Sequence, residues 1–150
     1  MKLVMFDDGG GWRPGAVAVS GGRDEAPAVV DLSALSMSLG GSPARTLSEL
    51  LPRLVDGGDD LRAWATEAVA DADAASNRGW LVESPGWRLG PPVGRNGSII
   101  CAGANYAAHL AEMSDLATPS STLWFTKSPM SVIGTGEPIV LPPAVPDMVD

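Results

Sequence analysis

The chain opens with short apolar runs of the β type. Residues 2–6 alternate weakly between polar and apolar positions, and residues 16–20 and 28–32 are rich in alanine and valine. The second and third runs are separated by Gly-Gly-Arg-Asp at 21–24, a composition typical of a turn. The pattern predicts strands that form a hairpin or a meander.

The apolar positions of the next segment follow the helical period. Leucine at 47, 50, 51 and 54 and valine at 55 recur at i, i+3, i+4, i+7 and i+8, which predicts one apolar stripe on a helix. Thr46 and Glu49 have the spacing of a capping box, in which the hydroxyl accepts from a free N–H and the carboxylate reaches back. Pro52 lies inside the stripe, so we expect a kink or one loosened turn there.

A second helix is expected after Asp59 or Asp60, either of which can cap it. Its shared apolar face comprises Leu61, Trp64, Ala65, Ala68 and Val69. Residues 71–77 read as a polar exit from this helix, and residues 80–82 as a short strand.

The remaining chain has a different organisation. Residues 98–102 form an apolar run typical of a buried strand, and Asn105 is a good N-cap for a short helix that follows. Residues 123–125 and 138–141 are expected to be further strands. The fold class predicted is α+β. A small α+β domain at 1–88 and a linker at 89–97 precede 98–150, the incomplete beginning of a mixed β-sheet domain.

Composition and charge exclude several classes of protein. Apolar residues make up 45% of the 150, enough for a core, and 18 glycines and 13 prolines favour many turns over a helical bundle. The formal net charge is −8 and Lys and Arg are not clustered, so we expect no nucleic-acid partner and no membrane partner. The single Cys101 excludes an internal disulfide, and no signal-peptide or membrane-spanning run is present. We therefore expect a cytoplasmic protein.

Candidate catalytic chemistry centres on the single histidine. His109 and Glu112 are three residues apart on the expected short helix, hence on one face. A carboxylate that fixes one ring nitrogen leaves the other free to act as a base toward water. The alternative is an exposed helix pair worth about 0.2–0.5 kcal/mol.

Other residues carry weaker signals. Lys127 follows an apolar strand and could hold a substrate carboxylate or an enolate oxygen, or it could be a solvated strand end. Gly9-Gly10-Gly11 lacks the ending of a phosphate loop and indicates a turn. Cys101 is expected to be a buried core thiol.

Several stretches, in order, resemble the fumarylacetoacetate hydrolase family. They are a strand followed by Gly103-x-Asn105-Tyr106-x-x-His109-x-x-Glu112, then Phe125-x-Lys127-x-Pro129, and then the loop and strand from Ile133 to Pro142. Residues 1–9 and 30–32 are similar to the small domain that often precedes the catalytic domain.

The resemblance implies a metal-dependent enzyme that cleaves C–C bonds of acylpyruvates or related 2-oxo and β-keto acids. Decarboxylation or isomerisation is the alternative reaction. It implies that His109 and Glu112 form the catalytic dyad, that Lys127 binds substrate, and that Mg²⁺ or Mn²⁺ holds the 2-oxo acid and stabilises an enolate. The family's metal ligands, a Glu-x-Glu pair and a later Asp, are expected beyond Asp150, so no metal ligand is assigned here. A homodimer is implied for the full-length protein.

Two alternatives stay open at this point. The 150-residue chain, expected to be inactive alone, could be a truncated, non-catalytic module that acts by binding or assembly. It could also be an unrelated α+β domain that resembles the family by accident.

Overall fold

The computed structural model describes residues 1–18, 28–56, 60–83, 87–93, 97–103, 106, 121–141 and 143. Helices and strands both occur, which confirms the α+β class. The chain divides into two compact units, residues 1–94 with 133–150 and residues 95–132. His109, Glu112, Asn105 and the helix expected around them lie outside the described residues. Among the helices described, none is long and apolar enough to cross a membrane.

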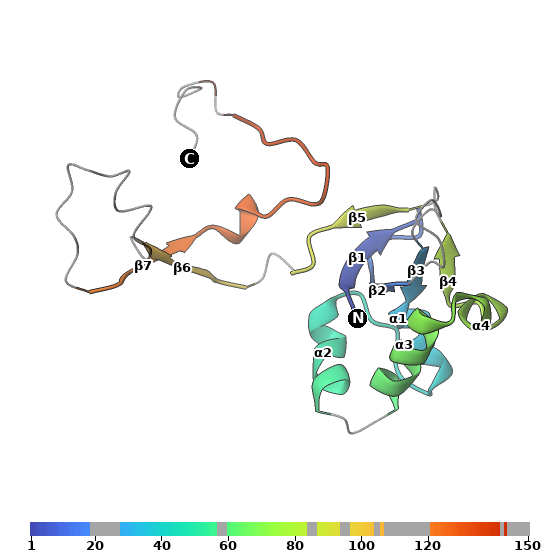
Figure 1. The fold of residues 1–150 in the computed structure, drawn as a ribbon. Coiled ribbons are helices and arrows are strands. Elements are labelled where there is room, and N and C mark those ends of the chain that lie inside the picture. The colour runs from blue at the N-terminus through green and yellow to red at the C-terminus, as the bar shows by residue number, and fades with distance from the viewer. Residues whose placement is uncertain are drawn as a thin grey trace. The chain divides into compact units, whose positions relative to one another are not determined.

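The first unit contains a five-stranded antiparallel sheet in the order β4-β3-β2-β1-β5 (Figure 1). Its strands are β1 (Leu3–Asp7), β2 (Arg13–Val17), β3 (Ala28–Asp31), β4 (Leu81–Glu83) and β5 (Arg88–Gly90). The predicted meander is therefore confirmed. Strand β2 begins three residues before the predicted run at 16, because Phe6 pairs with Arg13 across the tight Gly9–Gly11 turn.

Strand β5 was not predicted as an element. It begins one residue before the predicted linker at 89–97 and pairs with β1, with Phe6 opposite Leu89 and Asp7 opposite Arg88. The predicted domain boundaries at 88 and 98 stay a prediction. The described part of 133–141 clusters with the first unit.

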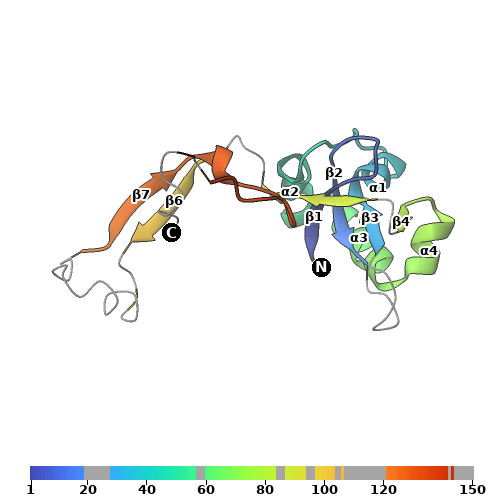
Figure 2. The ribbon, with the colours of Figure 1, turned by 90° about the horizontal axis from the view of Figure 1, so that it is seen from above.

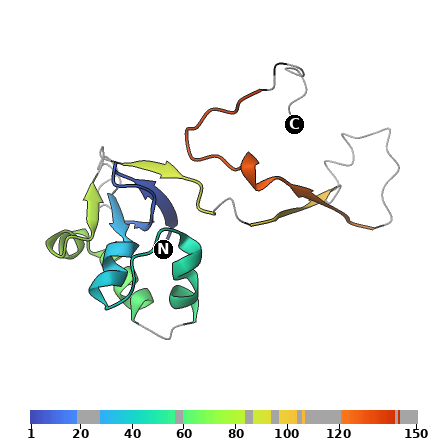
Figure 3. The ribbon, with the colours of Figure 1, turned by 180° about the vertical axis from the view of Figure 1, so that it is seen from behind.

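The helices of the first unit pack against one face of the sheet, as Figures 1 and 3 show from opposite sides. They are α1 (Leu32–Ser38), α2 (Leu47–Val55), α3 (Leu61–Ala70) and α4 (Ala72–Asn77). Alternate sheet residues, among them Ala16 and Val30, join Leu35, Leu50, Leu61 and Ala65 in the core between the two layers. Burial of this layer stabilises the unit by about 25 cal/mol for each Å² of apolar surface removed from water.

Helix α2 confirms the predicted period but not the predicted cap. Leu47, Leu50 and Leu54 are buried, whereas the other two members of the predicted stripe are exposed. The Thr46 side chain makes no cap hydrogen bond; its hydroxyl donates to Glu49 Oε1 at 2.9 Å, and Glu49 Oε2 accepts from the Arg45 N–H at 3.0 Å. The carboxylate thus reaches back one residue further than a capping box requires.

Pro52 does not end helix α2. The helix runs to Val55, and the Asp56 N–H donates to the Pro52 carbonyl at 2.8 Å. Only the hydrogen bond that a Pro52 N–H would donate is lost, and the next turn forms normally.

The apolar face of helix α3 is confirmed, with Leu61, Ala65, Ala68 and Val69 buried. Asp60 occupies the N-cap position, but its side chain makes no cap hydrogen bond, and Asp59 lies outside the described residues. The predicted polar exit at 71–77 is wrong, because residues 72–77 form helix α4. Asp71 caps this helix by accepting from the Ala74 N–H at 2.9 Å. The short strand expected at 80–82 is β4, one residue later.

The second unit contains two antiparallel strands, β6 (Ile99–Gly103) and β7 (Leu123–Lys127), which lie side by side in Figures 1 and 2. Both predicted strands are confirmed, and β7 runs two residues further than expected. The expectation that the first of them is buried is wrong, because Ile100 in β6 is 66% exposed. The strand predicted at 138–141 is wrong, because these described residues form no strand. Pro138 has no N–H to donate to a ladder, and Ile139 and Val140 are exposed.

Candidate functional site

Lys127 is the predicted site residue that the structure describes. It occupies the last position of β7, directly opposite Ile99 of β6, and it is exposed. Ser128 follows and caps a short 3-10 helix, Pro129–Ser131, by accepting from the Met130 N–H at 3.2 Å. This turn ends the strand directly after Lys127 and so sets the backbone position from which the lysine side chain extends.

The ladder register defines which residues share a face with Lys127. Opposed residues of an antiparallel pair project to the same side, and successive residues alternate. The Lys127 face therefore comprises Ile99, Cys101 and Gly103 from β6 with Leu123, Phe125 and Lys127 from β7. The opposite face, here the Trp124 face, comprises Ile100, Ala102, Trp124 and Thr126.

Phe125 and Gly103 are in close contact on the Lys127 face. A Cβ atom placed on Gly103 would lie 3.3 Å from Phe125 Cε1 and 3.6 Å from Leu123 Cβ. The Phe125 ring therefore leans toward Gly103 and away from Lys127, even though it pairs with Cys101. Cys101 is half-buried and not fully buried as predicted. It lies in a sheet of two strands, which leaves part of its side chain exposed.

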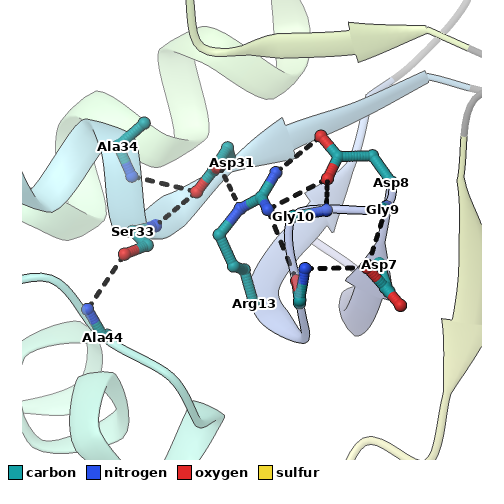
Figure 4. A network of polar contacts seen from close by, with 10 residues as sticks. Asp7, Asp8, Gly9, Gly10, Arg13, Asp31, Ser33, Ala34 and Ala44 are labelled. Atoms are coloured by element: carbon teal, nitrogen blue, oxygen red, sulfur yellow. Dashed lines mark hydrogen bonds and ion pairs between the residues drawn. The ribbon is translucent and has the colours of Figure 1, made fainter.

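The first unit contains a network of polar contacts that the sequence patterns did not predict (Figure 4). The Arg13 guanidinium lies between two carboxylates: Nη2 donates to Asp8 Oδ2 at 2.7 Å, and Nε donates to Asp31 Oδ2 at 2.8 Å. Asp31 Oδ1 accepts from the Ser33 and Ala34 N–H groups at 2.9 Å and caps helix α1. Hydrogen bonds from Arg13 and from the Gly10 N–H lower the pKa of Asp8 to about 2.

The neighbouring Asp7 organises the glycine turn. Its Oδ1 accepts from the N–H groups of Gly9 and Gly11 at 2.9 Å, and its Oδ2 accepts from Arg88 at 3.0 Å. Gly9 and Gly11 have φ near +100°, a conformation that side-chain-bearing residues rarely adopt. The Gly9 N–H, the Arg88 side chain and the Gly11 N–H together lower the pKa of Asp7. These carboxylates are ionised and occupied in holding the turn, so the network is structural and confirms the glycine run as a turn.

The described residues provide a poor set of donors for a divalent metal ion. Within the part of the chain that the structure describes, no three His, Cys, Asp or Glu side chains converge. Hard cations such as Mg²⁺ require several oxygen ligands together. Glu137 accepts from the Gly134 N–H at 2.8 Å and so serves its own loop. The described residues therefore do not fit the metal.

Comparison with known proteins finds a family match for the last third of the chain. Residues 98–149 match the family described as Fumarylacetoacetate (FAA) hydrolase C-terminal. Over this segment the chain is similar to the fumarylacetoacetate hydrolase family, which supports the resemblance drawn from its motifs. A search of curated proteins finds no match.

The matched segment contains His109, Glu112 and Lys127, whereas the Arg13 network lies outside it. The match supports a protein of the general hydrolase and isomerase type found in this family. The only signals that could have revealed the Arg13 network are the adjacent Asp7 and Asp8 before a glycine run, a spacing that indicates side-chain-supported turns.

Proposed function

We propose that the chain contributes the His109–Glu112 dyad and Lys127 to an enzyme that hydrolyses the C–C bond of acylpyruvates or related 2-oxo acids. The observation that carries this proposal is the family match over 98–149, which spans these residues. The position of Lys127 supports it, because an exposed ammonium group at a strand end can reach a ligand anion.

In the proposed reaction His109, oriented by Glu112, accepts a proton from water as the oxygen attacks the acyl carbonyl carbon. The C–C bond to the pyruvate fragment then breaks, and its electron pair remains on that fragment as an enolate. The imidazolium returns the proton to the enolate carbon, so the products are a carboxylic acid and pyruvate. The Lys127 ammonium group holds the 2-oxo acid carboxylate or the enolate oxygen throughout.

The divalent metal of this proposal is Mg²⁺ or Mn²⁺. The part of the chain that the structure describes offers no cluster of donors, so from these residues we expect no tight binding of either ion. We also expect the 150-residue chain to show no acylpyruvate cleavage alone. Titration calorimetry with each ion, together with an assay for pyruvate release, measures both expectations. Metal-dependent pyruvate release by the purified chain would contradict them.

Substrate anchoring is tested by exchanging lysines. Lys2 and Lys127 are the lysines of the chain, so Lys2→Met is a matched control for Lys127→Met. We expect pyruvate to perturb backbone amide NMR signals of 97–103 and 121–128, with this effect lost in Lys127→Met and kept in Lys2→Met. Equal binding of pyruvate by the two variants would show that Lys127 does not bind it.

The dyad is tested through the single histidine, whose ring protons give one resolvable NMR titration curve. A nearby carboxylate stabilises the imidazolium, so Glu112→Gln should move the titration midpoint of His109 to lower pH. Glu137→Gln is the control, because Glu137 is held by the Gly134 N–H in its own loop. Coincident curves for wild type and Glu112→Gln would leave His109 without its proposed partner.

A second candidate function is a non-catalytic module that acts by binding or assembly. The observation that favours it is apolar exposure on both faces of the β6–β7 ladder, where Trp124 is 70% exposed and Leu123 53%. Light scattering over a range of protein concentrations tests it. Concentration-dependent assembly that Trp124→Ser abolishes would support it, and a monomer at every concentration would count against it.

A further inference from the structure

Beyond its lysine, the Lys127 face offers the ring of Phe125 as a second recognition element. The ring is 46% exposed and stands two positions from Lys127 on the same strand and the same side. Residues two apart on a strand are separated by about 6.6–6.8 Å. A cation and an aromatic ring therefore extend from the same side of one strand, from backbone positions two residues apart.

The contact with Gly103 fixes which way the ring leans. Its Cε1 atom lies 3.3 Å from the position of a Gly103 Cβ, so the ring occupies the space that a side chain there would fill. Leu123 extends the apolar surface on the same side, next to Gly103. The Lys127 face therefore has a charged end at Lys127 and an apolar end at Phe125 and Leu123. One elongated ligand can contact both ends.

We propose that Phe125 is a specificity-determining residue that selects 2-oxo acids carrying an extended apolar chain. This inference rests on the proposed function, because it takes Lys127 as the carboxylate anchor. With the carboxylate at Lys127, an apolar chain several bonds long reaches the Phe125 ring and removes its exposed surface from water. Pyruvate is too short to make this contact and gains nothing from the ring.

The experiment compares two probes, pyruvate and 2-oxooctanoate, on the 150-residue chain by backbone amide NMR titration. The variant is Phe125→Leu, which keeps an apolar side chain in the strand but removes the ring. Trp124→Leu is the matched control, since Trp124 is the adjacent residue and lies on the opposite face. The same spectra report whether each variant keeps the amide pattern of the β6–β7 ladder.

We expect Phe125→Leu to weaken 2-oxooctanoate binding about threefold or more and to leave pyruvate binding unchanged. We expect Trp124→Leu to bind both acids as wild type does. If Phe125→Leu binds both acids like wild type while Lys127→Met binds neither, the proposed function stands and the role of Phe125 is overturned. If wild type binds neither acid, the anchoring of the carboxylate by Lys127 in the proposed function fails, and the role of Phe125 fails with it.

Discussion

A single carboxylate, that of Asp31, joins several parts of the first unit. It ends strand β3, accepts from two backbone N–H groups at the start of helix α1, and receives the Arg13 side chain from β2. Its side chain is only 10% exposed, so water cannot replace these partners easily.

Replacing Asp31 with alanine should therefore be costly. We expect Asp31→Ala to lower the free energy of unfolding by about 2–3 kcal/mol, because a cap and a charged hydrogen bond are both lost. Asp71→Ala is the control: Asp71 also caps a helix, but it is exposed and bonds one N–H, so we expect a loss of about 0.5–1 kcal/mol. Urea denaturation measures both, and equal losses would contradict the account.

Asp8 makes the stability of the first unit sensitive to acid. Its pKa is lowered to about 2 in the folded state by Arg13 and the Gly10 N–H, from an ordinary value of 3.8. The native state therefore binds this proton less readily than the unfolded state. The contribution of Asp8 is complete above about pH 4 and is lost as the pH falls toward 2.

The corresponding measurement is the urea midpoint between pH 5 and pH 2. We expect the midpoint to fall with pH in the wild type, and to fall less steeply in Asp8→Asn, which has no carboxylate to protonate. Asp7 contributes in the same direction, since its pKa is also lowered, so some slope should persist in that variant. Identical slopes for wild type and Asp8→Asn would show that Asp8 does not cause the loss of stability at low pH.

At the scale of elements, helix α2 shows how one apolar stripe divides into buried and exposed positions. Leu50 is 2% exposed and packs in the core, whereas its neighbour Leu51 is 40% exposed. Helix α2 therefore packs in the first unit through a narrower stripe of buried residues than its sequence predicts.

Adjacent substitutions in this helix should therefore differ. We expect Leu50→Ala to cost about 2–5 kcal/mol of unfolding free energy, because it leaves a cavity in the core. Leu51→Ala removes the same atoms from a position open to solvent, and we expect a loss of about 0.5 kcal/mol or less. Thermal or urea unfolding of the two variants measures the difference in unfolding free energy. Similar losses would mean that α2 packs with a different face toward the core.

Sequence periodicity found the elements that carry strong repeats and missed the others for physical reasons. Helices α2 and α3 have apolar stripes, and both were predicted. Helix α1 was missed because Ser33 and Ser36 occupy buried positions, where the first accepts from the Ala44 N–H at 2.9 Å and the second donates to the Ser42 carbonyl. Strand β5, three residues long, is too short to show alternation.

The candidate site was predictable only where a motif carried it. Lys127 stands at the end of its strand as expected, but its shared face with Phe125 depends on the ladder register, which no local pattern specifies. The Arg13 network joins residues from separate strands, so it emerges only when the sheet forms.

At the scale of the whole molecule, the two units differ in how they treat apolar surface. The first encloses a core between sheet and helices, while the β6–β7 ladder has apolar side chains on both sides. Ile100 and Trp124, both on the Trp124 face, are 66% and 70% exposed. This exposure on both sides of the ladder is the observation behind the proposed binding or assembly function.

A dye that fluoresces on apolar surfaces should report this difference. We expect 1-anilinonaphthalene-8-sulfonate to bind the native chain, and its emission to fall in the double variant Ile100→Ser/Trp124→Ser. Leu51→Ser is the control, since it removes an exposed leucine of the first unit. Emission that is unchanged in the double variant would place the dye elsewhere.

The position of β1 between β2 and β5 has a consequence for how the protein is made. Asp7 and Arg88, which bond across this pairing, are 81 residues apart in sequence. During synthesis the β1–β2 hairpin can form early, but β1 lacks its second neighbour until Arg88–Gly90 has left the ribosome. Throughout that interval one edge of β1 is open to pairing with other nascent chains, so the first unit depends on prompt translation of its last strand to avoid aggregation.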